Sequence, residues 1–508
     1  MSKLNQKIVS INRIIKLTKE LKKKNKKIVL CHGVFDLLHL GHLKHFNSAK
    51  KFGDKLVVSI TPDKYVNKGP GRPLFNQNLR AEFLSNISAV DFVIINDKST
   101  SVDLIKDLKP NIYCKGSDYK NHKEDITGQI KNELIVLKKI GGKIKYTDEL
   151  TNSSSKIINN YFDQFSKNQK KNISNIKKTP INVDKIFNSF SKLKILIIGE
   201  TIIDHYFFCE TLGKSGKDPV LQMQELKNEV YVGGSAAIAG HISKLSKNIT
   251  LLTMLGENKK YEKFLKGKIS KKVNLKIIYK KNSPTIIKKK FVDSITKHKV
   301  FGSYTINDSP LVYNDEKKLE NILKNLLPSY DLVVVSDYGH GFISKKNARL
   351  ICKKSKFLAL NAQINAANRG YHTMKNYKGV DCVIVNEMEL RHELRDKSGN
   401  LNTLMKKLSK NIIINELIVT MGQQGARLFN KNTNKFHNME AFATQVVDKI
   451  GSGDTMLALL ALCLKNKLDK RLSLLIASLA ASQAVGNIGN KYLVDEIKLK
   501  KSIEHILK

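Results

Sequence analysis

The sequence predicts an α/β protein with two domains, each built around a mainly parallel sheet. A chain of 508 residues is longer than one domain usually is. Short apolar segments alternate with amphipathic segments in two separate series, a pattern typical of parallel strands covered by helices. Between the two series, residues 161–190 are rich in Lys, Asn and Ser, as linkers often are. We therefore expect one domain on each side of this segment.

The first series belongs to a domain expected over residues 26–160, preceded by a leading amphipathic helix within residues 1–25. Its strands are short, apolar and rich in Val and Ile, and the segments between them have helical spacing. We expect strands at 27–31, 55–60, 91–95 and 112–115, and helices at 42–51, 79–86 and 102–108. This order predicts a Rossmann-like fold.

The second series, residues 191–508, predicts a larger α/β domain. Two of its segments, 220–232 and 285–304, have the composition of β-hairpins and suit a small β lid over the sheet. The main strands are expected at 193–198, 332–336, 358–361, 383–386 and 414–420.

The net charge of +44 would by itself favour a polyanionic partner such as nucleic acid. The excess, however, consists of Lys residues scattered through the whole chain, whereas nucleic-acid surfaces more often combine clustered Arg with aromatic residues. We therefore expect small anionic substrates and no specific nucleic acid, and keep a basic nucleic-acid-binding protein as a third hypothesis.

The cysteines and the hydropathy of the chain indicate the cellular compartment in which we expect the protein. The six cysteines show no C-x-x-C spacing, and several lie in apolar runs where a thiol acts as a small hydrophobic group. No segment approaches the roughly 20 apolar residues of a membrane-spanning helix. We expect a cytoplasmic protein without a membrane partner.

The first candidate site lies where the first strand ends and the next helix begins. Here Gly33, Phe35 and Asp36 precede the motif His39-Leu40-Gly41-His42. A strand-to-helix turn is where α/β proteins bind phosphate, and two imidazoles three residues apart could donate hydrogen bonds to phosphoryl oxygens. The alternatives are a chance HxGH string or histidines that merely cap the helix.

Residues 33–42 resemble the GxFDxxHxGH signature of the cytidylyltransferase-like nucleotidyltransferases. Two later segments, 68–80 and 110–119, resemble the adenylyltransferase half of bifunctional heptose kinase/adenylyltransferases, and 153–155 lies where the superfamily has an ISTT-like helix start. The resemblance implies nucleotide or phosphate binding by Gly33, Phe35, Asp36, Lys68, Arg72, Arg80, Lys115, Asp118, Ser153, Ser154 and Ser155. One departure is Leu40, which stands where the heptose enzymes usually have Pro.

The implied chemistry is attack by a phosphate oxygen on the α-phosphorus of a nucleoside triphosphate. This reaction needs positioning and charge stabilisation more than a protein nucleophile. His39 and His42 would stabilise the reacting phosphate as the catalytic pair, with Mg²⁺ sharing the charge. The donor, ATP or CTP, is left open.

The second candidate site is the segment Asp448–Met456. Gly451, Ser452 and Gly453 precede an apolar helix, so their backbone N–H groups can form an anion hole, with the Asp454 carboxylate at its mouth. A base there could take the proton from a sugar hydroxyl that attacks the γ-phosphate of ATP. The alternative is an ordinary Asp near the start of a helix after a Gly-rich turn.

This segment resembles the DTxGAGD signature of the ribokinase (phosphofructokinase B) family, and companion motifs extend the resemblance over about residues 191–490. It implies that Asp454 is the catalytic base, that Asn386 and Glu389 serve the metal, and that ATP is the donor. It further implies nucleotide contacts from Gly451, Ser452, Gly453, Thr420 and Gly422, and substrate contacts from Asp204, Gly233, Gly234 and Asp337.

Three departures concern the sugar pocket. Lys449 replaces the Thr of the signature, Ala237 stands where an Asn often contacts sugar, and residues 361–365 replace a stretch found in many heptose kinases. A sugar kinase is therefore better supported than a heptose kinase.

A kinase that makes a sugar 1-phosphate and a nucleotidyltransferase that accepts one are consecutive steps, so their fusion predicts a nucleotide-activated sugar for surface glycans. The resemblance implies that this product is ADP-heptose-like. The domain order is the reverse of the usual heptose enzyme. A second hypothesis is a CTP-dependent transferase for another phosphorylated acceptor, joined to a drifted kinase domain. Family likeness also suggests a homo-oligomer.

Overall fold

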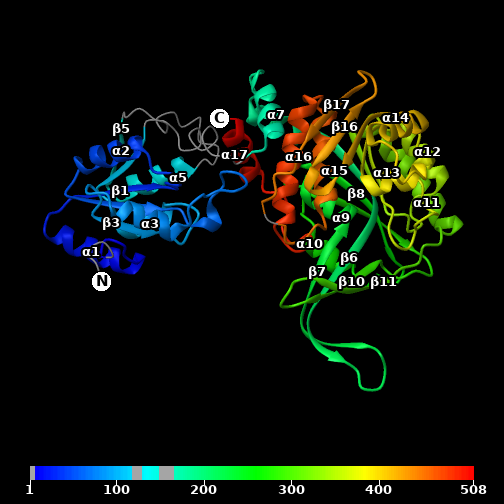
Figure 1. Cartoon of the computed structure of the whole chain (residues 1–508), viewed down its shortest axis with the longest axis horizontal. Coiled ribbons are helices and arrows are strands. Elements are labelled where there is room, and N and C mark those ends of the chain that lie inside the picture. Colours follow the sequence, from blue (N-terminus) through cyan, green and yellow to red (C-terminus); the bar gives the residue numbers. More distant parts are fainter. Residues whose placement is uncertain (1–5, 117–128, 148–164, 445, 508) are drawn as a thin grey trace. The chain divides into compact units, whose positions relative to one another are not determined.

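The computed structural model describes residues 6–116, 129–147, 165–444 and 446–507. The chain forms two compact units, one comprising Met1–Lys167 with Lys500–Lys508, the other Asn168–Leu499 (Figure 1). Both are α/β, which confirms the predicted fold class. No helix in these described ranges is long and apolar enough to cross a membrane.

The first unit contains a five-stranded sheet in the order β3-β2-β1-β4-β5. Every neighbouring pair of these strands is parallel. Because the order reverses at β1, the loops after β1 and β4 leave the sheet on opposite sides, and a crevice for a ligand forms at such a point. The strands are β1 (Ile28–Gly33), β2 (Lys55–Ile60), β3 (Phe92–Ile95), β4 (Ile112–Gly116) and β5 (Lys143–Thr147).

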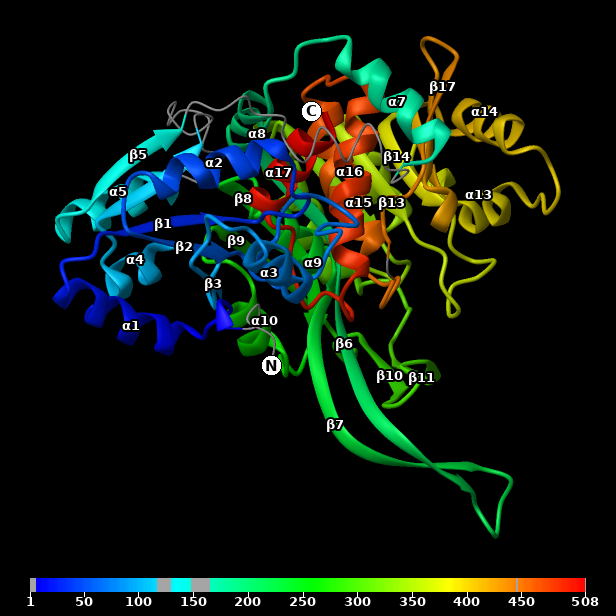
Figure 2. The same cartoon turned by 60° about the vertical axis from the view of Figure 1, so that its left-hand side comes forward.

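Helices cover both faces of this sheet. One apolar core joins β1 and β2 to Phe46 of α2 and Leu84 of α3, and the other joins the opposite face to α1, α4 and α5. Figure 2 shows α2 on one side of β1, with α1 and α4 on the other. The helices are α1 (Ile11–Lys23), α2 (Leu40–Lys50), α3 (Gln77–Ser85), α4 (Val102–Leu108) and α5 (Gln129–Lys139).

The predicted elements of this unit are confirmed, and α5 and β5 are additions that the sequence reading did not include. Side-chain caps fix several helix starts: the side chains of Ser10 and Asn76 accept backbone N–H bonds at the N-termini of α1 and α3. The strand β5 has an alternating burial pattern with exposed Lys residues, which suits an edge strand.

The second unit is built on one long strand, β6 (Lys194–Lys214), that takes part in two layers. Its first residues pair in parallel with β8 and β12 in the main sheet, and its later residues pair with β7 and β10 in the lid. The strand predicted from the sequence, 193–198, covers only the first part of β6. The paired strands β6 and β7 run on as a long hairpin that extends away from the remainder of this unit (Figure 1).

The main sheet continues from β6 through β12 to β17, and on the other side through β8 to β9. Its strands are β8 (Asn248–Gly256), β9 (Val273–Lys280), β12 (Leu332–Asp337), β13 (Leu358–Ala362), β14 (Val380–Asn386), β15 (Ile414–Thr420), β16 (Ala426–Asn430) and β17 (Lys435–Met439). The lid strands are β7 (Leu221–Gly234), β10 (Ile287–Asp293) and β11 (Lys299–Thr305), where β-hairpin segments were predicted.

The helices α15 and α16 are almost wholly buried, which explains their continuous apolar sequences. Two helices, α7 and α8, lie in the segment predicted as a linker. The helices after β5 are α7 (Lys167–Lys177), α8 (Val183–Ser191), α9 (Ser235–Ile242), α10 (Glu262–Lys268), α11 (Tyr313–Leu326), α12 (Lys345–Lys354), α13 (Glu387–Leu394), α14 (Leu401–Ile412), α15 (Ser452–Lys465), α16 (Lys470–Val485) and α17 (Glu496–Leu507).

Candidate active sites

The two histidines of the HxGH motif form the start of α2. His39 is the N-cap residue: its Nδ1 accepts a hydrogen bond from the backbone N–H of Gly41 at 3.2 Å. The backbone N–H of His39 in turn donates to Nδ1 of His42 at 3.4 Å, which completes a capping box. The two ring centroids lie 4.0 Å apart. Both imidazoles therefore stand side by side at a helix N-terminus.

This arrangement determines the protonation of both rings. Burial lowers the pKa of His39, and burial together with the charge of His39 lowers the pKa of His42 to about 3. The positive charge of Lys68 depresses both pKa values further. A neutral ring whose Nδ1 accepts a hydrogen bond carries its proton on Nε2. Both histidines thus present an Nε2–H donor, as phosphate recognition requires.

Gly33, Phe35 and Asp36 shape the loop that leads to these histidines. The Phe35 ring packs against His42 at 5.6 Å between centroids, and a Cβ at Gly33 would lie 2.9 Å from the Phe35 ring. The buried carboxylate of Asp36 accepts hydrogen bonds from the backbone N–H groups of Leu74 (2.6 Å) and Phe75 (3.3 Å). These residues organise the loop around the site.

The two arginines predicted to bind phosphate are both buried. Arg72 donates from Nε to Asp36 at 2.7 Å. Among the residues that the structure describes, its buried outer nitrogen Nη2 has no hydrogen-bond partner, so a donor remains for a ligand. Arg80, only 1% exposed, donates to the carbonyls of Phe75, Val34 and Thr61 and to the Asp63 carboxylate. Arg80 therefore holds the loop together.

Lys115, the last residue but one of β4, lies in a buried polar cluster. Its Nζ lies 3.6 Å from the Glu133 carboxylate of α5, which also accepts hydrogen bonds from Tyr113 and Ser101. Burial raises the pKa of Tyr113, whereas the Lys115 charge opposes that shift. Lys115 is thus paired with Glu133 in the interior of the first unit. The remaining predicted residues of this site, Asp118, Ser153, Ser154 and Ser155, lie outside the described residues.

The second site is centred on Asp454 in the first turn of α15. Gly451 is the N-cap residue of this helix, with a φ of 86° that favours glycine. A Cβ on Gly451 would lie 2.2 Å from the side-chain oxygen of Asn490, whereas the position of Gly453 is open. With Ser452 between them, these residues leave backbone N–H groups at a helix start accessible to an anion.

Three elements bring charged and hydrogen-bonding groups to Asp454. The hydroxyl of Tyr338 donates to Asp454 Oδ1 at 2.9 Å. Asp204 of β6 forms an ion pair with Lys290, and Lys288 lies 5.6 Å from the centre of the Tyr338 ring. Lys288 and Lys290 alternate along the lid strand β10, which pairs with β6 at Asp204.

Burial raises the pKa of Asp454 to about 7, and the negative charge of Asp204 adds to the rise. The hydrogen bond from Tyr338 and the charges of Lys288 and Lys290 act in the opposite direction. Burial lowers the pKa of Lys288, an effect that Asp204 opposes. A carboxylate with a pKa near neutrality is suited to general base catalysis at physiological pH.

The GG pair makes room for Asp204. A Cβ on Gly233 would lie 2.4 Å from the Asp204 carboxylate, and one on Gly234, whose φ is 64°, would lie 2.4 Å from the carbonyl oxygen of Glu200. A larger residue at Gly233 would displace the Asp204 carboxylate, and one at Gly234 would strain the backbone.

Asp337, predicted as a substrate residue, is engaged inside the protein. It is 3% exposed, accepts hydrogen bonds from the Tyr377 hydroxyl at 2.7 Å and the Gly339 N–H at 3.0 Å, and shares a buried region with Glu200. Burial and the neighbouring Asp337 charge raise the pKa of Glu200 to about 7. The next residue, Tyr338, is the one that contacts Asp454.

Asn386 and Glu389 form a capping box at the start of α13. The Glu389 carboxylate accepts the Asn386 N–H, and the Asn386 side chain accepts the Glu389 N–H, each at 2.8 Å. Burial raises the pKa of Glu389 to about 7, with a further contribution from Asp454. Thr420 ends β15, and Gly422 follows it with a φ of 59° at a tight turn.

Tyr338, Lys288 and Lys290 are the site residues that the sequence reading missed. The two lysines lie in a run of three, Lys288 to Lys290, in a predicted hairpin segment, where alternate residues of a strand share one face. Tyr338 lies in one of the companion motifs of the family, Ser336–Gly339, but no local pattern indicates its contact with Asp454, because the two residues are 116 positions apart.

Two family models match the chain: pfkB family carbohydrate kinase at residues 192–496, and Cytidylyltransferase-like at residues 30–160. This confirms the predicted order of the two domain types. The chain is 39% identical over 145 residues to Bifunctional protein HldE of Aliarcobacter butzleri, covering 28% of this chain and 30% of that protein.

It is 30% identical over 331 residues to Bifunctional protein HldE of Campylobacter jejuni, covering 62% of this chain and 66% of that protein. The match spans less than two thirds of either relative's length. Phosphofructokinase-2 from Escherichia coli, solved with substrates and products, matches with 13% identity and a TM-score of 0.50, over 62% of this chain and 100% of that one. That likeness shows the fold alone.

Proposed function

Because the chain belongs to the pfkB family of carbohydrate kinases and also carries a cytidylyltransferase-like segment, we propose that it is a bifunctional enzyme with two consecutive reactions. The first phosphorylates a sugar or sugar phosphate with ATP. The second transfers a nucleotidyl group to the resulting sugar 1-phosphate. The observation that carries the proposal is Asp454 at the start of α15, hydrogen-bonded to Tyr338 and close to the charges of Asp204 and Lys288.

In the kinase reaction Asp454 acts as the general base. Its carboxylate accepts the proton of a sugar hydroxyl while the hydroxyl oxygen bonds to the γ-phosphorus of ATP, and ADP leaves. The N–H groups of Gly451, Ser452 and Gly453 at the start of α15 stabilise the transferred phosphoryl group, as helix N-termini do. Tyr338 holds the carboxylate in place through its hydrogen bond.

Lys288 and Lys290 favour a sugar substrate that already carries a phosphate. Both lie on β10 beside Asp204, and Lys290 is already paired with that acid. A neutral sugar needs hydrogen-bonding groups but no second ammonium group in its pocket, whereas a phosphate carries close to two negative charges. In this proposal Asp204 binds sugar hydroxyls and Lys288 pairs with the substrate phosphate.

In the nucleotidyl transfer, an oxygen of the sugar 1-phosphate attacks the α-phosphorus of ATP or CTP, and pyrophosphate leaves. The Nε2–H groups of His39 and His42 donate to the phosphate oxygens on which charge accumulates. The buried Nη2 of Arg72 and the ammonium of Lys68 add positive charge to the same loop. The product would be an ADP-heptose-like sugar.

Mg²⁺ fits the donors of the kinase site. Glu389 is a carboxylate whose charge interacts with that of Asp454, and Mg²⁺ prefers oxygen ligands of this kind. When bound with ATP, the ion supplies charge neutralisation of the phosphates. Asn386 orients Glu389 through the capping box.

The setting that follows is a cytoplasmic enzyme, assembled as a homo-oligomer, whose nucleotide sugar serves surface glycan synthesis. An activated sugar is consumed by glycosyl transfer, and both nucleotides are available in the cytoplasm. The partners are therefore small phosphorylated molecules.

The test is a mass-spectrometric assay of the full chain with Mg²⁺, ATP, CTP and a panel of sugars and sugar 7-phosphates. We expect a bisphosphate that is converted to a nucleotide sugar, and the product mass names both sugar and base. Nucleotidyl transfer to supplied phosphates without any kinase product would contradict the coupled pathway and favour a CTP-dependent transferase with a drifted kinase domain. Tight, salt-sensitive nucleic-acid binding without either product would favour the third hypothesis.

A further inference from the structure

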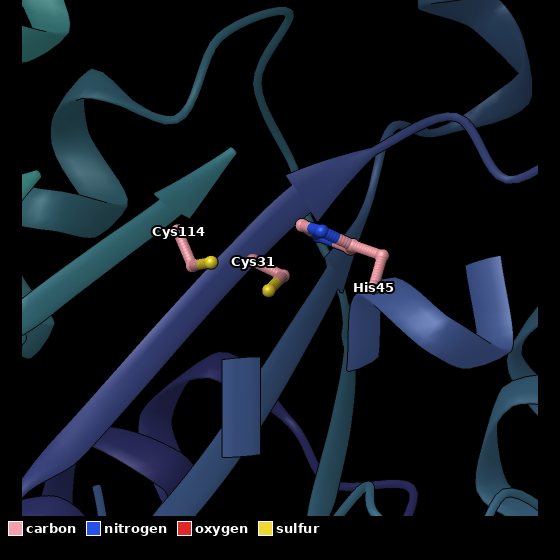
Figure 3. A group of neighbouring side chains, drawn as sticks. All are labelled: Cys31, His45 and Cys114. Atoms are coloured by element: carbon pink, nitrogen blue, oxygen red, sulfur yellow. The ribbon is translucent and has the colours of Figure 1, made fainter. Parts of the chain in front are cut away.

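Three side chains with metal-binding chemistry converge on one face of the first unit's sheet. Cys31 of β1 and Cys114 of β4 are direct neighbours in the parallel register, and His45 reaches toward them from α2. Figure 3 shows the Cys114 thiol pointing toward Cys31, with the imidazole of His45 extending over β1. One ligand atom from each residue lies within 4.8 Å of the others. Within the described ranges this is the one such group.

Two thiols and one imidazole form a ligand set typical of zinc. A tetrahedral Zn²⁺ takes sulfur at about 2.3 Å and imidazole nitrogen at about 2.0–2.1 Å, which sets the ligand atoms roughly 3.5–3.8 Å apart. The three ligand atoms need to approach by about 1 Å from their limit of 4.8 Å, a movement within the reach of side-chain rotation.

The surroundings of His45 match those of a metal ligand. Its Nδ1 lies 2.7 Å from the hydroxyl oxygen of Thr147 at the end of β5. Histidines that bind metal through one nitrogen ordinarily hydrogen-bond through the other, which fixes the ring orientation. In the proposed site His45 would bind the ion through Nε2, and its ring is half-buried.

The two thiols lie in a nonpolar layer. Cys31 and Cys114 belong to the apolar core between the sheet and α2, at 0% and 1% exposure. Burial raises the pKa of Cys31, and a hydrogen bond between the two thiols adds to this. Without a metal the Cys31 thiol is therefore neutral. Binding would release two protons and leave a Zn²⁺ balanced by two thiolates, which is a neutral unit suited to burial.

We propose that Cys31, Cys114 and His45 bind a thiophilic divalent cation of the zinc class, with water or an added ligand in the fourth position. The three ligands are none of the residues that the proposed reactions use, so the site does not rest on the proposed function. His45 follows His42 by three residues on α2, so the ion would fasten the helix that carries the HxGH motif to strands β1 and β4. Its role is to hold this helix on the sheet.

The test begins with the metal content of the full chain, produced without a metal-affinity tag in zinc-supplemented medium and measured by inductively coupled plasma mass spectrometry. We expect about one equivalent of zinc per chain, since the three ligands form a single site. Replacement by Co²⁺ should give the visible bands of a tetrahedral ion and a thiolate charge-transfer band. If the isolated protein carries another thiophilic divalent metal instead of zinc, the same bands after exchange for Co²⁺ would also support the site.

Single variants then assign the ligands. We expect most of the bound zinc and of the cobalt thiolate band to be lost in Cys31→Ser and in Cys114→Ser. The variant His45→Gln should lose most of both or bind the metal at least about 10-fold more weakly. Cys352→Ser is the matched control, because Cys352 is a half-buried thiol of the second unit and should leave metal content unchanged. If the buried serine variants fail to fold, the half-buried His45→Gln variant still decides.

Three results would overturn the proposal. One is a chain with negligible thiophilic metal that also shows no cobalt thiolate band after reconstitution. The second is bound metal that persists in all three variants. The third is a Cys31–Cys114 disulfide in freshly purified protein, detected by peptide mass. Each is independent of kinase or transferase activity.

Discussion

The hydroxyl group of Tyr338 donates a hydrogen bond of 2.9 Å to Oδ1 of Asp454, joining the end of β12 to the start of α15. This contact places a phenol beside the carboxylate that we assign as the kinase base. A hydrogen bond to the charged form stabilises it, and it holds down a pKa that burial has raised to about 7. The bond thus sets both the position and the protonation of the base.

Removing this hydrogen bond should shift the pH dependence of the kinase. The carboxylate must be ionised to act, so kcat/KM for phosphorylation should fall as the pH drops through about 7, the pKa of Asp454. Tyr338→Phe removes a contact that lowers this pKa, so the acid limb should move to higher pH. Profiles of kcat/KM from pH 5.5 to 9 for both proteins would test this expectation. If the acid limb of the variant were unchanged, the limb would not report the ionisation of Asp454.

Asp454→Asn should abolish phosphorylation and spare nucleotidyl transfer. The amide cannot accept the hydroxyl proton, and loss of a general base lowers rates about 10²–10⁴-fold. ADP release measures the first reaction, and pyrophosphate release from supplied sugar 1-phosphate measures the second. Equal loss of both activities in a folded variant would argue against two separate sites.

His39→Ala and His42→Ala should have the opposite effect. Each removes one Nε2–H donor to the reacting phosphate, and loss of one such donor typically lowers kcat about 10²–10³-fold. The same pyrophosphate assay reports this loss, with ADP release as the internal control. Since both imidazoles are neutral, with the pKa of His42 at about 3, the transfer rate should show no protonation of His42 between pH 5 and 8.

Lys288→Ala and Lys290→Ala should raise the KM for a phosphorylated sugar more than for the same sugar without phosphate. Each variant removes a positive charge beside Asp204. We expect a difference of about 10-fold or more, as for loss of a charge-assisted contact. Lys289→Ala is the matched control, because strand alternation directs residue 289 to the other face of β10. Equal effects on both sugars would refute the assignment.

Arg80→Met should destabilise the first unit by about 3 kcal/mol, because it removes a buried cation and leaves three backbone carbonyls without their donor. Arg13→Met, at an exposed position, should change stability by less than about 0.5 kcal/mol. Hydrogen exchange of peptides from β1 and β2 reports the unfolding free energy of this unit. A variant as stable as wild type that had lost nucleotidyl transfer would instead make Arg80 a phosphate ligand.

The sequence alone determined the two α/β domain types, their order and the two helix starts at which the candidate sites lie. These features are local: a strand, a turn with glycines and the first turn of a helix are encoded by adjacent residues such as Gly33–His42 and Gly451–Asp454. The family matches agree with that reading. The domain limits at 26–160 and 191–508 and the roles of the individual site residues stay predictions.

Only the tertiary structure decided which polar groups face a ligand and which serve the protein itself. The sequence predicts nucleotide or phosphate contacts for both Arg80 and Asp36, yet both side chains are buried and hydrogen-bonded to backbone groups of the protein. Tyr338 meets Asp454 across 116 positions of sequence, and β6 is long because two sheets share it. The physical reason is that burial and hydrogen-bond partners come from strand pairing between distant segments, which no local pattern records.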